Sequence, residues 1–240
     1  MANPYFRNSS TPRPPPLAST VSARWRRATG VLRIAAGLLV LAALVTQVTD
    51  QLLNDAFVPE EYFAYFTIES SMMNVVTLIV AGVYAIRHAG DTELLTAVRA
   101  AILAYAVVTG SVYNLLLRGI PDTGFQGIAW PNDVLHVIIP IFIAIDWLIT
   151  PGRARLGWSA IWIAASYPIA WLAFTLLRGL ATGWFPYPFL RPDGPGGWGS
   201  VASYIIGIAV FIIALAALAV LTTRVAGRRR VDGGLQQPAL

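Results

Sequence analysis

The sequence predicts an all-α integral membrane protein with six transmembrane helices. Its 240 residues are 56% hydrophobic and only 12% charged, which is about half the charged fraction of a typical soluble domain. Several apolar runs approach the roughly 20 residues that a helix needs to cross a bilayer. Cysteine is absent, which excludes disulfides, thiol nucleophiles and sulfur-ligated metals.

The predicted order is a tail, six spans and a second tail. Residues 1–27 begin with a Pro-, Ser- and Thr-rich stretch and are predicted to form a disordered N-terminal tail. The transmembrane domain covers 28–226, with spans at about residues 31–49, 62–86, 94–117, 131–149, 158–179 and 200–223. No small-residue cleavage site follows the first span, so we expect it to be retained. Residues 227–240 are polar and Gly-rich and are predicted to be a second disordered tail.

The distribution of arginine predicts the orientation. Six spans place both termini on one side, and that side holds fourteen arginines against three on the other. The larger group is Arg7, Arg13, Arg24, Arg26, Arg27, Arg33, Arg87, Arg99, Arg153, Arg155, Arg224, Arg228, Arg229 and Arg230; the smaller is Arg118, Arg178 and Arg191. The positive-inside rule therefore predicts cytoplasmic termini in a plasma membrane. Because these cations lie at membrane boundaries, they do not indicate nucleic-acid binding. The absence of lysine suggests a GC-rich bacterial genome.

Two chemically capable side chains are predicted to lie at one depth. The second and fourth spans both enter from the outer side, and Thr67 and His136 each lie five residues in, roughly 7 Å below the helix start. The outer ends of three spans carry further polar residues, namely Ser70, Ser71, Asn74, Ser111, Tyr113, Asn114, Asn132 and Asp133. The inner halves are mostly apolar. This pattern predicts a polar cavity in the outer half of the bundle.

Most of these residues also have structural interpretations. A membrane Thr often returns its hydroxyl to a backbone carbonyl, Ser and Asn often bond between helices, and Asp133 suits the first turn of a helix. His136 differs because an ionisable group inside a span is a functional candidate by default. Asp146 is expected to be a structural or boundary acid, and the sequence assigns no role to Glu69.

The histidine, aspartate and threonine residues exclude some kinds of site and leave others possible. His88 and His136 are separated by most of a core about 30 Å thick, so they cannot share a haem iron. His136 and Asp133 supply two zinc ligands where three are normally needed. Thr67 fits as a nucleophile with His136 as its base, Asp133 or Asn132 orienting the imidazole, and Asn114 or Asn132 donating to an oxyanion. This reaction needs neither metal nor cofactor.

Three stretches resemble the androgen-induced and androgen-dependent TFPI-regulating membrane protein family. "YFTIES" (65–70) is similar to its Tyr-x-Thr segment, and "WPNDVLHVIIP" (130–140) resembles its Trp-x-Asn-His-x-x-His-Thr pattern followed by Pro. "TGWFPYPFLRPDGPG" (182–196) resembles its Thr-Gly-x-Trp-x-Tyr-Pro-Phe-Leu segment ending in Gly-Pro-Gly. The likeness covers roughly 28–226.

The resemblance implies a reaction. Animal members are six-span threonine hydrolases of fatty acid esters of hydroxy fatty acids, so Thr67 is expected as nucleophile and His136 as general base. Asp133 and Val137 stand where the pattern has His and Thr, which changes the group that orients the imidazole. Tyr187 and Pro188 are expected to shape an external loop over the cavity, either as a structural turn or in contact with a lipid or amphiphilic ester.

Two other functions remain open from the sequence. A related protein that binds a lipid or small molecule without activity would keep the same fold and cavity. A transporter is the third alternative, although the chain has no internal repeat and no acidic relay through its inner half. The sequence carries no signal for oligomeric state.

Overall fold

The chain folds into a helical bundle. We describe a computed structural model of residues 17–120 and 125–234, with side chains for 23–120 and 125–225. Within this part of the chain there is no strand, and six helices are long and apolar enough to cross a membrane. The predicted fold class is confirmed: the protein is an all-α, multi-pass membrane protein.

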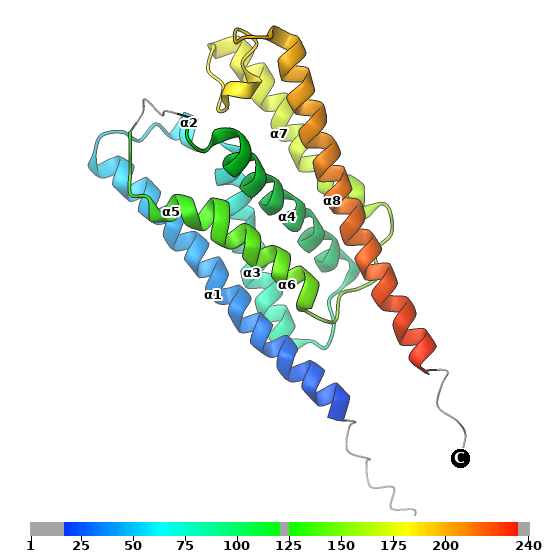
Figure 1. Ribbon diagram of the computed structural model, residues 1–240. Helices are drawn as coiled ribbons and strands as arrows, with labels where there is room; N and C mark the ends of the chain where they lie inside the picture. The colour runs from blue at the N-terminus through cyan, green and yellow to red at the C-terminus, as the bar shows by residue number, and fades with distance from the viewer. Residues whose placement is uncertain (1–16, 121–124, 235–240) are drawn as a thin grey trace, which may run out of the picture.

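The elements run in order along the bundle, as Figure 1 traces. They are α1 (Leu17–Leu53), α2 (Pro59–Tyr62), α3 (Phe66–Arg87), α4 (Glu93–Val112), η1 (Tyr113–Leu117), α5 (Trp130–Asp133), η2 (Val134–Ile138), α6 (Ile139–Ile149), α7 (Ala160–Thr182), η3 (Pro188–Leu190) and α8 (Gly197–Gly234). The elements η1 and η2 are π-helical turns that continue α4 and join α5 to α6. The first turns of α1 and the last turns of α8 lie at the same end of the bundle (Figure 1), which we call the termini end. The opposite end, which holds the start of α3 and the α7–α8 loop, is the site end.

Two helices extend further than the sequence indicates. The first begins at Leu17 and the last continues to Gly234, so residues 17–27 and 227–234 are helical where tails are predicted. Both helices extend because their polar ends keep the hydrogen-bonded register of the apolar spans that they continue. The remainder of each predicted tail, 1–16 and 235–240, lies outside the described residues.

Helices α1 and α3 approach each other closely at two glycines. A Cβ on Gly30 would lie 2.8 Å from the Gly82 carbonyl oxygen, and a Cβ on Gly82 would lie 2.6 Å from that of Gly30. Helices in lipid gain most from van der Waals packing, and small residues at a crossing allow that packing. This contact fixes the position of α3, which carries Thr67.

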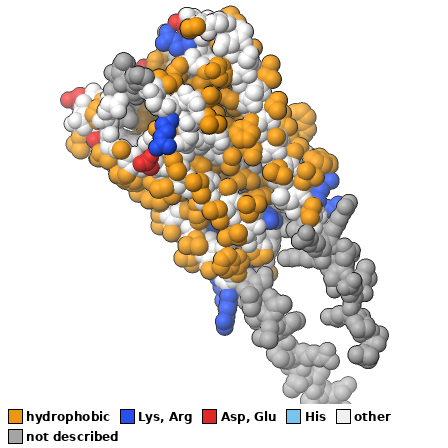
Figure 2. All heavy atoms as spheres, viewed as in Figure 1, with side chains coloured by type: hydrophobic (Ala, Val, Ile, Leu, Met, Phe, Trp, Pro, Cys, Tyr) orange, Lys and Arg blue, Asp and Glu red, His pale blue; other side chains and the backbone are white. Residues whose placement is uncertain are grey.

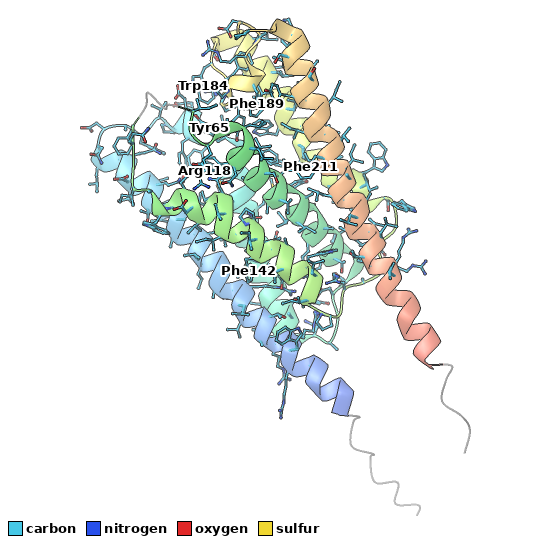
Figure 3. The ribbon with its side chains drawn as sticks, viewed as in Figure 1. Tyr65, Arg118, Phe142, Trp184, Phe189 and Phe211 are labelled. Carbon is cyan, nitrogen blue, oxygen red and sulfur yellow. The ribbon has the colours of Figure 1, made fainter. Side chains whose placement is uncertain are left out.

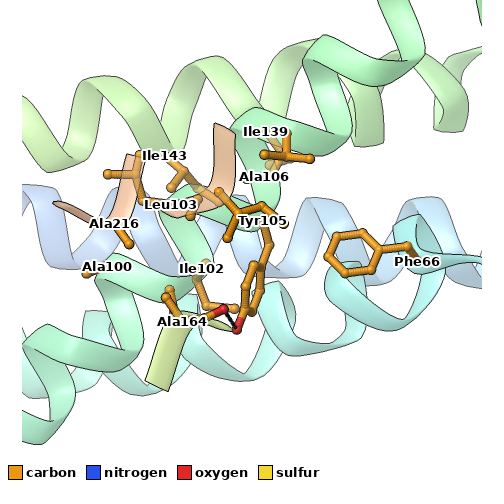
Figure 4. Close-up of a cluster of buried hydrophobic side chains, with 14 of the residues drawn as sticks. Phe66, Ala100, Ile102, Leu103, Tyr105, Ala106, Ile139, Ile143, Ala164 and Ala216 are labelled. Atoms are coloured by element: carbon orange, nitrogen blue, oxygen red, sulfur yellow. Dashed lines mark hydrogen bonds between the residues drawn. The ribbon is translucent and has the colours of Figure 1, made fainter. Parts of the chain in front are cut away.

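Helix α4 lies at the centre of the core. It buries 56% of its most apolar stretch, and alanines on several sides allow its neighbours to approach. Figure 4 shows Ala100, Leu103 and Ala106 among this cluster, with the Tyr105 hydroxyl donating to the Ala164 carbonyl at 2.8 Å. That bond connects α4 to α7 without leaving a buried hydroxyl unpaired.

Helices α7 and α8 pack more loosely. Only 17% of the most apolar stretch of α7 and 22% of that of α8 is buried, and the two run together along one side of the bundle (Figure 1). Large side chains such as Trp162, Leu177 and Ile206 are exposed on them. In Figure 2 apolar side chains cover most of the visible face, and most charged side chains lie towards its ends. This is the surface expected of a protein that faces hydrocarbon.

Candidate active site

Thr67 lies in the first turn of α3. The sequence places it five residues into its span, but residues 59–62 form the separate helix α2, and α3 itself begins at Phe66. The first N–H groups of a helix have no intrahelical partner. The Thr67 N–H therefore donates outside the helix, to the Tyr187 hydroxyl oxygen at 3.4 Å. The first turn of a helix also favours negative charge.

The Thr67 hydroxyl faces the imidazole of His136. The Oγ1–Nε2 distance is 3.4 Å, and both residues are buried. The other ring nitrogen, Nδ1, lies 3.0 Å from the backbone carbonyl oxygen of Asn132. Because a carbonyl oxygen only accepts, Nδ1 carries the proton of the neutral imidazole and the Nε2 lone pair faces Thr67. This is the tautomer that a general base for a hydroxyl needs.

Tyr113 holds the imidazole ring from one face. The two ring centroids are 3.9 Å apart with planes inclined at 24°, and the Asn132 side-chain amide donates to the Tyr113 hydroxyl. Asn132 thus fixes His136 through its backbone carbonyl and, by way of Tyr113, through its side chain. The ring has little freedom to turn away from Thr67.

Pro140 and Asn114 together shape the helix around His136. In a regular helix the N–H of residue 140 would bond to the His136 carbonyl, but proline has no N–H. The Asn114 amide supplies the missing donor at 3.1 Å and donates to the Gly110 carbonyl at 2.8 Å. A Cβ on Gly110 would lie 3.0 Å from the His136 carbonyl oxygen, so glycine allows this close approach. Both π-helical turns of the protein's described part meet here, and such turns occur frequently at functional sites.

Tyr187 covers the other side of Thr67. It lies in the α7–α8 loop before η3, and Tyr65, Trp171 and Phe189 surround its ring at centroid distances of 5.6, 6.0 and 5.2 Å. Figure 3 shows Tyr65, Trp184 and Phe189 gathered at the site end. Burial raises the pKa of Tyr187 to about 12, so its hydroxyl keeps its proton at neutral pH and can donate a hydrogen bond.

An apolar cavity of about 130 Å³ adjoins Thr67. It lies between α3, α4, α7 and α8, and its lining includes Val108, Val112, Leu172, Ile205 and Ile208. Thr67, Tyr113 and Tyr187 line it too. The sequence predicts a polar cavity, whereas this one suits a hydrocarbon chain with its reactive group at Thr67.

Three predicted cavity residues lie elsewhere. Ser70, Ser71 and Asn74 are buried in α3 but do not line this cavity. The Ser70 hydroxyl donates to the Thr67 carbonyl at 3.3 Å, because a short polar side chain in a helix readily bonds to its own backbone. Their spacing along α3 places these residues on the same face as Thr67, but spacing alone does not say which neighbouring helix that face meets.

Two predicted supporting roles also change. Asp133 is exposed, and no described hydrogen bond joins it to His136; it lies in the first turn of its helix, where the helix dipole favours a carboxylate. Both N–H bonds of the Asn114 amide are used by backbone carbonyls, and its oxygen accepts from Arg118 at 3.0 Å. Asn114 therefore has no N–H left for an oxyanion.

Glu69, which has no predicted role, and Asp146, which is expected to be a structural or boundary acid, both have hydrogen-bond partners. Glu69 accepts from the Tyr167 hydroxyl at 3.0 Å, which links α3 to α7 next to the site. Asp146 accepts from Arg33 and Arg99 at the termini end. Within the described residues, no group of three or more His, Cys, Asp or Glu side chains is placed to hold a metal ion; the expectation of a cofactor-free reaction stays a prediction.

Comparison with models of known families, with characterised proteins and with solved structures finds no match to this chain. The likeness to the androgen-induced family therefore rests on its three sequence stretches. The structure brings these together: Thr67 comes from the first, His136 from the second and Tyr187 from the third.

Proposed function

We propose that this protein is an intramembrane hydrolase of amphiphilic fatty acid esters, with Thr67 as nucleophile and His136 as general base. The observation that carries the proposal is the 3.4 Å approach of Thr67 Oγ1 to His136 Nε2, with Nδ1 facing a carbonyl that fixes the tautomer. The apolar cavity beside Thr67 supplies a place for the acyl chain. Distant membership of the androgen-induced family, a bacterial plasma membrane and cytoplasmic termini complete the proposal.

The first half of the reaction transfers the acyl group to Thr67. The Thr67 oxygen attacks the ester carbonyl while its proton passes to His136 Nε2. When the tetrahedral intermediate collapses, the carbon–oxygen bond to the alcohol breaks, and the imidazolium returns the proton to the departing alkoxide. The product is an acyl-threonine.

One donor lies beside the place where the oxyanion would form. The Tyr187 hydroxyl oxygen accepts from the Thr67 N–H at the positive end of the α3 dipole, and its own O–H, buried and protonated, is left to donate to the oxyanion. We assign Tyr187 as an oxyanion donor in place of Asn114. A donor preorganised in an apolar site is effective because it needs no reorganisation when charge develops.

Water completes the cycle. His136 accepts a proton from the attacking water, and the tetrahedral intermediate releases the fatty acid as Thr67 recovers its proton. Because the cavity lies against the loosely packed α7 and α8, an ester dissolved in the bilayer has a short path to Thr67.

A fluorophosphonate probe tests the nucleophile. The purified protein should be labelled, Thr67→Ala should abolish labelling, and His136→Gln should slow it by roughly 10²- to 10⁴-fold. Thr109→Ala is the matched control, because Thr109 is a buried threonine lining the same cavity but distant in sequence from the predicted nucleophile; it should keep its labelling. Undiminished labelling of the Thr67→Ala protein would remove Thr67 as nucleophile.

Lipid binding without catalysis is the second candidate. The apolar cavity alone favours it, because a hydrocarbon chain can occupy that space whether or not Thr67 reacts. In that case native mass spectrometry would detect co-purifying lipid, the probe would label nothing, and Thr67→Ala would leave lipid occupancy unchanged. A transporter would instead move substrate across proteoliposomes without hydrolysis, and no structural feature favours it.

A further inference from the structure

A buried network of charges joins four parts of the bundle at the termini end. Arg26 and Arg99 both pair with Asp91, and Arg99 and Arg33 both pair with Asp146 at 3.0 Å. These residues come from α1, the α3–α4 loop, α4 and α6, and all five are buried. The network holds three guanidinium groups and two carboxylates, so one positive charge is unbalanced.

Further positive charge adjoins the network. The guanidinium carbons of Arg99 and Arg153 lie 5.8 and 4.9 Å from the Trp147 ring centroid. Burial, followed by the nearby charge of Arg99, lowers the pKa of Arg153 to about 10. Uncompensated positive charge next to hydrocarbon is unfavourable, and this region would be stabilised by a negative partner.

Arg33 has hydrogen-bonding capacity left over. Its side chain is fully buried, and its Nε donates to both Asp146 oxygens at 3.0 Å. Nη1 reaches the Ala81 carbonyl only at 3.4 Å, and Nη2 has no partner. A buried guanidinium with unused N–H bonds is costly. Arg26 is better satisfied, because it also donates to the carbonyls of His88 and Pro151.

A small cavity lies beside Arg33. Its volume is about 20 Å³, and its lining includes Arg33, Arg99, Thr77 and Asp146. A cavity of this size holds one particle about as large as a water molecule, and a halide ion is only slightly larger. The Asp146 oxygens already accept from Arg33, Arg99 and Thr150, so the carboxylate is neutralised. The groups free to donate into the cavity are the Arg33 guanidinium and the Thr77 hydroxyl.

We propose that this cavity binds one small monovalent anion of the halide class, held by the guanidinium of Arg33 with support from Arg99 and Thr77. The anion balances the unpaired charge of the network and accepts the unused N–H bonds of Arg33. The site is independent of Thr67 and of the proposed hydrolysis.

Anion-dependent stability tests the proposal on the purified full-length protein. Chloride or bromide should raise Tm saturably over gluconate at constant ionic strength. At a concentration about 100-fold above Kd, the rise should be roughly 5 to 10 °C. Bromide should also give an anomalous scattering peak between Arg33 and Thr77 in crystals. Equal Tm in all three salts, or water in place of bromide, would overturn the proposal.

Two variants locate the effect. Thr77→Val removes one donor with little change of shape and should weaken anion binding several-fold, whereas Thr109→Val, in the other cavity, should not. Arg33→Gln should abolish the anion dependence, while Arg191→Gln, at an exposed ion pair, should keep it. If Arg33→Gln does not fold, the wild-type salt series and the Thr77→Val protein still decide. An unchanged anion dependence in Thr77→Val and Arg33→Gln would exclude this cavity.

Discussion

The two ends of the bundle hold their polar residues in different ways. At the termini end, each carboxylate of the network accepts from two arginines, and Asp146 accepts from Thr150 as well. At the site end, Thr67 and His136 meet at 3.4 Å, and the Thr67 N–H reaches Tyr187 at the same distance. At the termini end most polar groups are held in strong ion pairs. At the site end the hydrogen bonds are long and lie beside an apolar cavity.

The two arrangements suit different tasks: the paired charges at the termini end stabilise the fold, and the looser contacts at the site end suit the proposed reaction. Charge-assisted pairs with several partners hold helices in register, whereas long contacts around a nucleophile can shorten when a substrate arrives. We therefore expect substitutions at the termini end to change unfolding more than turnover, and those at the site end to do the reverse. The predictions below test this contrast, beginning with the largest expected effect.

Asp146→Ala should destabilise the protein most. It removes the carboxylate that pairs with both Arg33 and Arg99, and uncompensated buried charge typically costs about 3–5 kcal/mol. The Tm of the variant should be roughly 6 to 20 °C lower than that of the wild type. Asp193→Ala breaks an exposed pair with Arg191 and should leave Tm unchanged. A Tm for Asp146→Ala equal to that of the control would show that the network does not hold the bundle.

Tyr187→Phe should lower kcat by roughly 10²- to 10³-fold, because it removes the proposed oxyanion donor. KM and Tm should stay near wild type, since the phenyl ring keeps its aromatic neighbours. Tyr62→Phe is the matched control: Tyr62 is a buried tyrosine that donates to Gln47 at 3.1 Å, and its loss should not affect kcat. Equal kcat for Tyr187→Phe and wild type would reduce Tyr187 to a loop-packing residue.

Pro140→Ala should reduce kcat by roughly 10- to 100-fold, because small misplacements of a catalytic group are costly. The new N–H competes with Asn114 for the His136 carbonyl and favours a regular α-helix over the π-helical turn. Tm should change little. Pro151→Ala, at the termini end, provides the comparison and should keep full turnover. Should the Pro140→Ala enzyme turn over normally, the π-helical turn has no part in placing His136.

Asp133→Asn should have the smallest effect, less than about threefold on kcat, because its carboxylate is exposed and screened by solvent. The hydrolysis rate at low and high salt measures any remaining long-range contribution. A tenfold loss would instead mean that Asp133 orients the imidazole, as its position in the family pattern suggests.

The sequence was sufficient to predict Thr67 and His136 as candidate site residues, but not the residues that surround them. Counting spans and residues placed Thr67 and His136 at the same depth, because depth depends only on helix length and direction, and the family resemblance paired them. Sequence reasoning missed the role of Pro140, whose missing N–H matters only once Asn114 is known to lie opposite. It assigned Asp146 a structural role without partners, because a partner such as Arg33 is 113 residues away. Contacts that depend on how each helix is rotated about its axis cannot be read from a single sequence.

The apolar cavity beside α7 and α8 determines how turnover of a lipid-borne ester must be measured. If the protein hydrolyses such an ester as proposed, the substrate diffuses to Thr67 within the plane of the membrane, so its effective concentration is its mole fraction in the bilayer or micelle. Adding inert detergent at constant ester would dilute the surface and slow the reaction, while adding more buffer would not. Rates measured against the bulk concentration of ester would therefore depend on the amount of detergent, and they should be measured against the mole fraction of ester.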